Sequence, residues 1–449
     1  MSKRLIEILS LICICLGYFM VILDTTVVTI ALPNIQHELG AAISDLQWIV
    51  SGYTLVFACL LLSAGALGDR LGNKRMFLIG LVLFTGASVA CGLAPNMWTL
   101  QLARVVQGAG AALQVPASLA LLNHTFADPH ERDRAIGLWG GIAGVAAAGG
   151  PIIGGLLVNA LSWRSVFFLN IPVGIVALLL AWRFVPHVEG RQGRGLDLGA
   201  QFAGIIALAL LTLAFIQSAA WGWTSLPILG SLAGFVLATV IFLLIERRSA
   251  SPMLPLGLFR SPTFSAANSV GLLLNFGFYG ELFVMTLFFQ NIRGLSALIT
   301  GLALLPQMGM AAFSSTLSGR VTGRGGARRS MIIGLTPGAA GFLLMTLVNA
   351  TTGYLLFVLP LMAIGFGMAF TMPAMTTAVI SSAPKERSGI ASGVVNASRQ
   401  VGSALSVAVL GSFVSQRATF IPGMHLALTI AGGAFLFGLL LTLLFVRQR

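Results

Sequence analysis

Near its N-terminus the sequence reads Leu23-Asp24-Thr25-Thr26-Val27-Val28-Thr29-Ile30-Ala31-Leu32-Pro33-Asn34-Ile35, and this stretch closes a long apolar run that begins near Ile8. A helix needs about 20 mostly apolar residues to cross a bilayer, and this run is long enough. Asp24 would then lie inside the membrane, where a charge costs roughly 3 kcal/mol on insertion scales and more than about 10 in simulations. We therefore treat Asp24 as a functional candidate; the alternative is a carboxylate at a helix mouth, neutralised by a neighbour.

The composition of the whole chain indicates a membrane protein. Of its 449 residues, 57% are hydrophobic and 9% are charged, with a mean hydropathy of +0.94. Soluble domains carry about 25% charged residues. The net charge of +13 is distributed over alternate loops, so it indicates a lipid bilayer as partner and no nucleic acid. The four cysteines lie in apolar runs without the spacing of a metal or haem site.

Apolar runs of spanning length recur along the whole chain. Fourteen are found: 8–31, 47–67, 76–94, 98–122, 136–159, 164–183, 197–217, 226–245, 264–290, 298–319, 329–349, 353–380, 398–416 and 425–446. The sequence therefore predicts an all-α polytopic membrane protein with fourteen spans.

The basic residues predict the orientation. With the N-terminus inside, 21 of the 26 lysines and arginines fall in cytoplasmic segments and three in external ones. Such a bias is the positive-inside pattern. We expect a multi-pass protein of the cell (inner, cytoplasmic) membrane with both termini in the cytoplasm.

The chain also repeats itself. The segment 65–81 recurs in weaker form at 319–335, and 108–117 recurs at 365–374. This duplication predicts two six-helix halves, 1–185 and 262–449, with two extra helices and their cytoplasmic linkers inserted at 186–261. Parallel duplication of this kind is typical of secondary transporters.

Motifs of enzymes and ATP-driven pumps are missing from the sequence. None of the three lysines follows a glycine, so there is no P-loop, and neither H-E-x-x-H nor G-x-S-x-G occurs. We predict no enzymatic activity, no cofactor, no metal, and an ion gradient as the energy source.

Two of the thirteen acids, Asp24 and Glu281, fall inside predicted spans. Burial favours the neutral form of a carboxyl group, which is what a proton carrier requires. Glu281 lies 257 residues after Asp24, so the two are candidates for related positions in the two halves. For Glu281 the alternative is a polar spot satisfied by Asn275 or Tyr279.

Arg104 lies within the fourth run. A guanidinium stays charged, so inside a membrane it must face a carboxylate, carbonyl groups or water, and it can influence a nearby acid without titrating itself. The alternative is an arginine that extends to the outer face near Trp98. Arg399 is the corresponding case in the thirteenth run.

Two glycine-containing motifs complete the candidate residues. The short loop from Asp69 to Arg75 has charges of both signs between two helix ends, which favours a gate on the cytoplasmic side over a simple basic loop; its residues are Gly65, Asp69, Arg70, Gly72, Lys74 and Arg75. The fifth run contains Gly150, Pro151, Gly154 and Gly155, which permit close helix contacts and a bend.

In order along the chain, these motifs resemble the major facilitator superfamily, and within it the EmrB/QacA-type fourteen-span drug:proton antiporters. The segments that carry the resemblance are 23–33, 65–75, Arg104-x-x-Gln107-Gly108-x-Gly110, 150–155, 163–172 and 392–402. Gly323 stands where the second copy of the loop motif would have an acid, so only the first half carries the complete motif.

The resemblance implies the major facilitator fold and a proton-coupled multidrug exporter of amphipathic, cationic drugs or antiseptics. Asp24, with Glu281 second, would bind protons and cargo in competition, and Arg104 would tune the exchange. Small lipophilic substrates and protons are the expected partners, and recruitment of a periplasmic adaptor stays open. The alternatives are an exporter or symporter of an endogenous metabolite on the same fold, or a non-transporting receptor. Expected lining residues are Phe276, Phe278, Tyr279, Phe283 and Met285.

Overall fold

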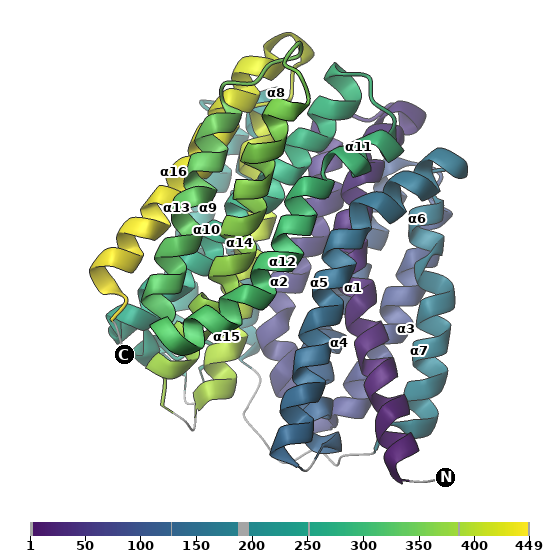
Figure 1. Ribbon diagram of the computed structural model, residues 1–449, viewed down its shortest axis with the longest axis vertical. Coiled ribbons are helices and arrows are strands. Elements are labelled where there is room, and N and C mark those ends of the chain that lie inside the picture. Colours follow the sequence, from purple (N-terminus) through teal and green to yellow (C-terminus); the bar gives the residue numbers. More distant parts are fainter. Residues whose placement is uncertain (1–2, 127, 187–196, 250–251, 385–386, 448–449) are drawn as a thin grey trace.

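The computed structural model describes residues 3–126, 128–186, 197–249, 252–384 and 387–447, and within these ranges every regular element is a helix. The long helices run side by side in one bundle (Figure 1). Arg191, Arg194, Lys385 and Arg449, which contribute to the predicted orientation, lie outside the described residues.

We call helices α1 to α7 the first half of the bundle. These helices are α1 (Lys3–Leu39), α2 (Ile43–Leu71), α3 (Asn73–Gly92), α4 (Met97–Thr125), α5 (Pro129–Ala160), α6 (Ser165–Phe168) and α7 (Asn170–Phe184). Gly72 joins α2 to α3 with φ 92°, a conformation that favours glycine. Asn96 and Asp128 begin α4 and α5 by accepting hydrogen bonds from backbone N–H groups of the first turn.

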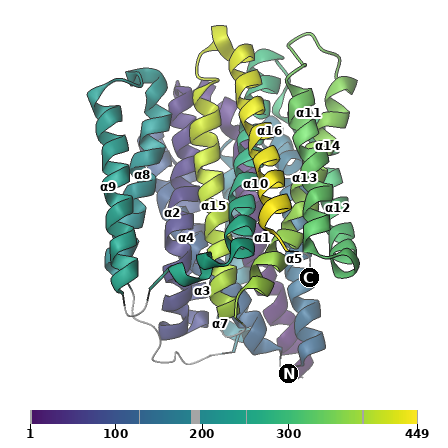
Figure 2. The same ribbon diagram turned by 90° about the vertical axis from the view of Figure 1, so that its left-hand side faces the viewer.

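We call the elements from α10 to α16 the second half. Its elements are α10 (Pro262–Leu287), the π-helix η2 (Phe288–Ile292), α11 (Ala297–Ala303), α12 (Leu305–Gly325), α13 (Ala327–Met345), α14 (Leu355–Ser382), α15 (Ser388–Ser412), η4 (Arg417–Thr419) and α16 (Phe420–Phe445). Between the halves come α8 (Leu198–Trp221), α9 (Leu226–Arg248) and η1 (Leu256–Arg260). Helices α8 and α9 form a pair at the edge of the bundle, and α8 packs against α2 and α15 (Figure 2). The three-part division of the chain stays a prediction.

The number of membrane spans is smaller than the sequence indicated. Among the described residues, eleven helices are long and apolar enough to cross a membrane, or twelve if α11 and α12, which meet at 42°, form one broken span. The predicted runs 329–349 and 398–416 correspond to α13 and α15, which do not meet these criteria. Helix α13 has Arg328 and Arg329 in its first turn. Helix α15 is rich in serine and glycine and contains Arg399. Fourteen spans are therefore not supported.

The bundle has two different ends. We call the end with the α2–α3 turn at Gly72 the terminal end, because both chain termini lie toward it (Figure 1). We call the opposite end, with the α1–α2 turn at Gly40, the far end.

The halves are closely joined at the far end by amide side chains. Gln47 Nε2 donates to the Val407 carbonyl at 2.8 Å, Gln290 Nε2 to the Ile30 carbonyl at 3.0 Å, and Asn291 Nδ2 to Gln36 Oε1 at 3.0 Å. Two glycines bring α5 directly onto α11 there. A Cβ on Gly155 would lie 2.6 Å from the Ala297 carbonyl oxygen, and one on Gly301 would lie 2.2 Å from that of Pro151. The bundle is therefore closed at the far end.

Candidate functional site

The buried charges of the first half form an ion pair between α1 and α4. Arg104 Nη1 donates to Asp24 Oδ2 at 2.5 Å, and both side chains are essentially inaccessible to solvent. Arg104 Nε also donates to the Ile49 carbonyl at 3.2 Å, and its guanidinium lies 4.2 Å from the centre of the Tyr53 ring. Arg104 thus faces a carboxylate and a carbonyl, and it does not extend to the surface near Trp98.

Two amides complete the surroundings of the Asp24 carboxylate. Its Oδ1 accepts hydrogen bonds from Gln107 Nε2 at 2.9 Å and Asn170 Nδ2 at 3.1 Å. Both amides also contact Ser88 Oγ, at 3.4 Å and 3.0 Å. Three donors, one of them a cation, thus hydrogen-bond to the Asp24 carboxyl group. Gln107 and Asn170 lie in the segments that carry the family resemblance, but the sequence assigns them no role. The available signal is an amide within an apolar run.

Gly108 explains how α4 brings Arg104 to this place. A Cβ at residue 108 would lie 2.4 Å from the Tyr53 carbonyl oxygen of α2. Only a residue without a side chain allows the two backbones to approach so closely. The guanidinium four residues earlier on α4 thereby reaches the Ile49 carbonyl and the ring of Tyr53.

A small central cavity of about 20 Å³ lies between the halves. Its lining includes Arg104 and Tyr53 from the first half and Tyr279, Gln400 and Ser403 from the second. A volume of this size is enough for about one water molecule. Asp24 is absent from the lining. In this conformation Asp24 is enclosed by the first half, and Arg104 contacts both the carboxylate and the cavity.

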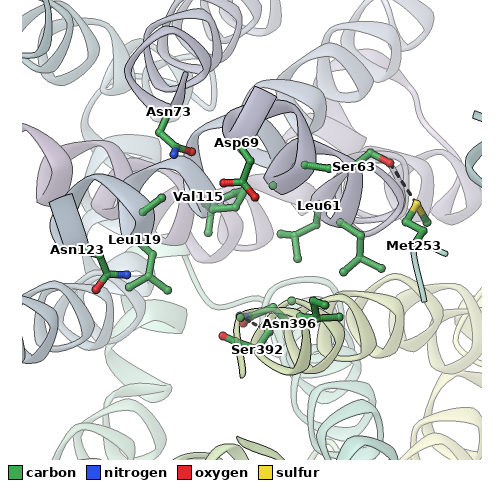
Figure 3. Close-up of a pocket in the computed structure, with 18 of the residues that line it drawn as sticks. Leu61, Ser63, Asp69, Asn73, Val115, Leu119, Asn123, Met253, Ser392 and Asn396 are labelled. Carbon is green, nitrogen blue, oxygen red and sulfur yellow. Dashed lines mark hydrogen bonds between the residues drawn. The ribbon is translucent and has the colours of Figure 1, made fainter. Parts of the chain in front are cut away.

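A larger cavity has a volume of about 430 Å³ (Figure 3). Its lining includes Asp69 and Asn73, on either side of the α2–α3 turn at Gly72, so we call it the terminal cavity. It is lined by α2, α4 and α15 and by the segment after α9; the residues labelled in Figure 3 are Leu61, Ser63, Asp69, Asn73, Val115, Leu119, Asn123, Met253, Ser392 and Asn396. Tyr18 and Trp139 also line it and stack with ring centres 3.8 Å apart. Two carboxylates, Asp69 and Asp197, face this space, and its described lining includes no lysine or arginine.

Four of the five residues expected in the apolar lining lie outside both cavities in this conformation. Of Phe276, Phe278, Tyr279, Phe283 and Met285, only Tyr279 lines either cavity. Phe278, Phe283 and Met285 are buried in the hydrophobic core, and Phe276 packs against it. Helix α10 is buried on nearly all sides, so its sequence has no polar face that would indicate its orientation. The direction in which each of these side chains points was therefore not predictable.

Two of the six residues of the predicted gate motif line the terminal cavity. Gly65 and Asp69 line it, and Asp69, Arg70 and Arg75 are exposed. Among the described residues no ion pair joins these three side chains. Lys74 has a separate contact, because its Nζ donates to the carbonyls of Trp182 at 3.0 Å and Val185 at 2.7 Å and so joins α3 to the end of α7.

The glycines of the fifth predicted run allow α5 to contact two helices. A Cβ on Gly150 would lie 1.8 Å from Thr26 Oγ1, and one on Gly154 would lie 3.0 Å from the Val27 carbonyl oxygen, both on α1. Gly155 and Pro151 form the contact with α11 described above. Helix α5 runs as one element from Pro129 through Pro151 to Ala160.

Glu281 lies on α10, in the second half, and is 1% exposed. Its Oε2 accepts a hydrogen bond from Gln307 Nε2 at 2.7 Å, so its partner is neither Asn275 nor Tyr279. Arg399 on α15 donates to Asn396 Oδ1 at 3.2 Å. No group of three or more metal-ligating side chains occurs among the described residues.

Proteins of known structure and named relatives resemble the chain over nearly its full length. A bacterial homologue of the human lysosomal transporter Spinster, in an inward-facing and unoccupied conformation, superposes with a TM-score of 0.67 at 17% identity over 100% of this chain and 98% of that chain. A POT family transporter superposes with a TM-score of 0.72 at 15% identity, covering 98% of this chain and 95% of that chain. These matches concern the fold alone.

Two relatives are closer in sequence. The methylenomycin A resistance protein of Bacillus subtilis is 36% identical over 437 residues, which is 97% of this chain and 94% of that protein. The multidrug resistance protein Stp of Mycobacterium tuberculosis is 39% identical over 409 residues, covering 91% and 76%. The sequence profile of the Major Facilitator Superfamily matches residues 14–407. The chain is therefore a multi-pass membrane protein that belongs to the Major Facilitator Superfamily.

Proposed function

We propose that this protein is a proton-coupled exporter of amphipathic drugs, of the EmrB/QacA type, in the cytoplasmic membrane with both termini inside. The names of its relatives support drug export, and membership of the superfamily makes it a transporter rather than an enzyme. The observation that carries the coupling is the position of Arg104, which pairs with Asp24 and also lines the central cavity.

In the proposed cycle, the ion pair between Asp24 and Arg104 breaks and then forms again. When the halves separate at the far end, a proton from outside reaches Asp24, neutralises the carboxylate and releases Arg104. When the proton leaves to the inside, the pair forms again. One charge that crosses 100 mV yields about 2.3 kcal/mol, and about 1.4 kcal/mol corresponds to a tenfold change. One proton per cycle thus supports a drug gradient of roughly fortyfold. Glu281 is a second proton-binding acid.

The terminal cavity is the proposed site at which cargo binds from the inside. Its volume of about 430 Å³ falls in the range of about 300–1,000 Å³ for drug-sized ligands. Asp69, Asp197 and the Tyr18–Trp139 stack favour a lipophilic cation, because carboxylates and aromatic faces both attract positive charge. Later in the cycle Asp69, Arg70 and Arg75 would close this end, while the glycines of α5 permit the change of packing.

The direct test is transport by the purified protein in liposomes. We expect uptake of a lipophilic cation into vesicles whose lumen is acidic, by molecules whose terminal end faces the external medium, and loss of uptake when a protonophore collapses the gradient. A neutral amphipath and a small metabolite serve as comparison substrates. Transport that ignores the proton gradient would contradict the coupling, and movement of cargo in the same direction as protons would indicate a symporter instead.

Removing the carboxylates of the terminal cavity should weaken binding of cationic cargo selectively. Asp197 Oδ1 accepts a hydrogen bond from the Ala200 N–H at the start of α8, and asparagine can keep such a cap. The double variant Asp69→Asn/Asp197→Asn should therefore fold, and we expect it to raise the KM for a cation by about threefold to tenfold, as partly exposed charges contribute up to about 1 kcal/mol each. A neutral analogue should keep its KM. Equal changes for both substrates would contradict a cationic cargo.

We also propose that α13 and α15 cross the membrane, which would restore fourteen spans. Both are packed among helices that do span: α13 against α14 and α16, and α15 against α2 and α10. Ala350→Cys, in the exposed α13–α14 connection, should then react from outside the cell like Leu93→Cys at the far end, and unlike Leu71→Cys at the terminal end. The four native cysteines are buried, which keeps background labelling low. If Ala350→Cys reacts like Leu71→Cys, α13 does not cross.

A further inference from the structure

The carboxyl group of Glu281 and the amide of Gln307 each have an oxygen without a hydrogen-bond partner. Both side chains are at most 1% exposed. The Gln307 Nε2–H donates to Glu281 Oε2 at 2.7 Å, while Glu281 Oε1 and Gln307 Oε1 have no partner. A buried polar atom left unpaired costs about 1–3 kcal/mol. Both atoms are oxygens on one hydrogen-bonded pair of side chains, so a single hydrogen atom between them would give each a partner.

Among the described residues, no cation pairs with Glu281. Five charged or titratable groups on or next to the elements packed around α10 and α12 have other contacts. Asp24 of α1 pairs with Arg104, and Arg399 of α15 forms a hydrogen bond with Asn396. His425 of α16 forms a hydrogen bond with the Val348 carbonyl, and Tyr354, which precedes α14, forms one with the Ala303 carbonyl. Arg293, which follows η2, lies over the ring of Phe357. The charged side chains of α5, α12 and α13 lie near the terminal end. An ionised, unpaired carboxylate is very unfavourable in such surroundings.

We propose that Glu281 carries a proton on Oε1 in this far-end-closed conformation, and that Gln307 holds it there. A protonated carboxyl group has one O–H donor and one acceptor oxygen, and a primary amide offers the complementary pair. The amide N–H then donates to Oε2 and the carboxyl O–H donates to the amide oxygen, so both unpaired oxygens gain a partner. The proton comes from solvent and returns to solvent, with no other bond changed.

The position of Gln307 connects this proton to the closed far end. Gln307 follows the break between α11 and α12 by two residues. A Cβ on Gly365 of α14 would lie 2.0 Å from the Gln307 carbonyl oxygen, so the backbone there is held firmly. Helix α11, on the other side of the break, carries the contact of Gly301 with Pro151. When the proton leaves, the pair loses a hydrogen bond and leaves a buried charge, and we infer that the bend changes and α11 separates from α5.

This inference rests on the proposed proton coupling and makes Gln307 a positioning residue for it. The first test is infrared spectroscopy of the full-length protein in nanodiscs. We expect the carbonyl band of a buried protonated carboxyl group, and loss of that band in Glu281→Gln, whose amide keeps the size and hydrogen bonding of the protonated acid. A spectrum without the band, or one unchanged by Glu281→Gln, would overturn the proposal.

The second test measures opening of the far end. Ala297→Cys is buried against Gly155 when the far end is closed, so its reaction with a maleimide reports opening. Labelling should rise with pH in this background, stay low at every pH in Glu281→Gln, and lose its pH dependence in Gln307→Leu, which should keep the infrared band. Gln114→Leu is the matched control, because Gln114 is also buried and both its polar side-chain atoms lack partners. If Gln307→Leu keeps the pH dependence, Gln307 does not transmit the proton's effect.

The two proposals fail separately. If liposome transport needs no proton gradient, the proposed function is wrong whatever the infrared spectrum shows. If transport needs the gradient but the infrared band is absent, protons are coupled through Asp24 alone and the Glu281–Gln307 proposal is wrong.

Discussion

Replacing Arg104 by leucine should destabilise the protein by about 3–5 kcal/mol and abolish export, because removal of one partner leaves the other charge buried without compensation. The Asp24 carboxylate would keep only the amides of Gln107 and Asn170 as donors. Asp24→Asn should cost a similar amount, since it leaves the guanidinium unpaired. Thermal unfolding in detergent measures the stability, and drug uptake into vesicles measures the transport.

The double variant Asp24→Asn/Arg104→Leu separates stability from coupling. Removing both charges should recover about 0.5–3 kcal/mol of the sum of the single losses, the usual range for residues in contact, while proton-driven export stays absent. The matched control is Arg164→Gln at the far end, whose ion pair with Glu38 is 30% and 48% exposed and should contribute no more than about 1 kcal/mol. Equal losses for the buried and the exposed pair would contradict the role assigned to Arg104.

Gly301→Ala should force the far end open. Its new methyl group would lie 2.2 Å from the Pro151 carbonyl oxygen, and overpacking of this kind costs about 1–3 kcal/mol. Because this contact joins α5 to α11 across the two halves, the strain falls on the closed conformation. A cost of that size changes the ratio of closed to open molecules by roughly fivefold to a hundredfold, and we expect export to fall with it.

Distances between spin labels at the far end measure the populations of molecules in which this end is closed and in which it is open. Gly309→Ala, on α12, is the control, because a Cβ there has nothing within 4 Å and alanine improves the helix. Populations in Gly301→Ala that match those of Gly309→Ala would show that the α5–α11 contact does not hold the far end closed.

Much of the fold was predictable because hydrophobicity along a chain is a one-dimensional signal. Each of the fourteen predicted runs coincides with a helix or with two consecutive helices. The run 298–319 contains a break at Leu304 that its apolar composition did not show. The run 398–416 lies mostly in α15, which ends at Ser412, yet polar residues such as Arg399 keep this helix outside the criteria for a span. Composition predicts that a segment is helical and apolar, but neither its bend nor its neighbours.

The candidate site was predictable only in part. Asp24, Glu281 and Arg104 were identified because charges within apolar runs are rare and costly. Their partners were not identified: Asn275 and Tyr279 were considered for Glu281, whereas the structure places Gln307 there. The sequence around an amide in an apolar run does not indicate which carboxylate the amide will bond, because that depends on how helices distant in sequence pack.

The sequence by itself determined that the chain crosses a membrane many times, repeats its halves and carries two acids and two arginines in apolar surroundings, because these are properties of composition and order. Only the tertiary structure decided that Arg104 neutralises Asp24 while Glu281 has an amide and no cation. The reason is that both choices depend on which helix faces which at distances of a few ångströms, and glycines such as Gly108 and Gly365 set those distances.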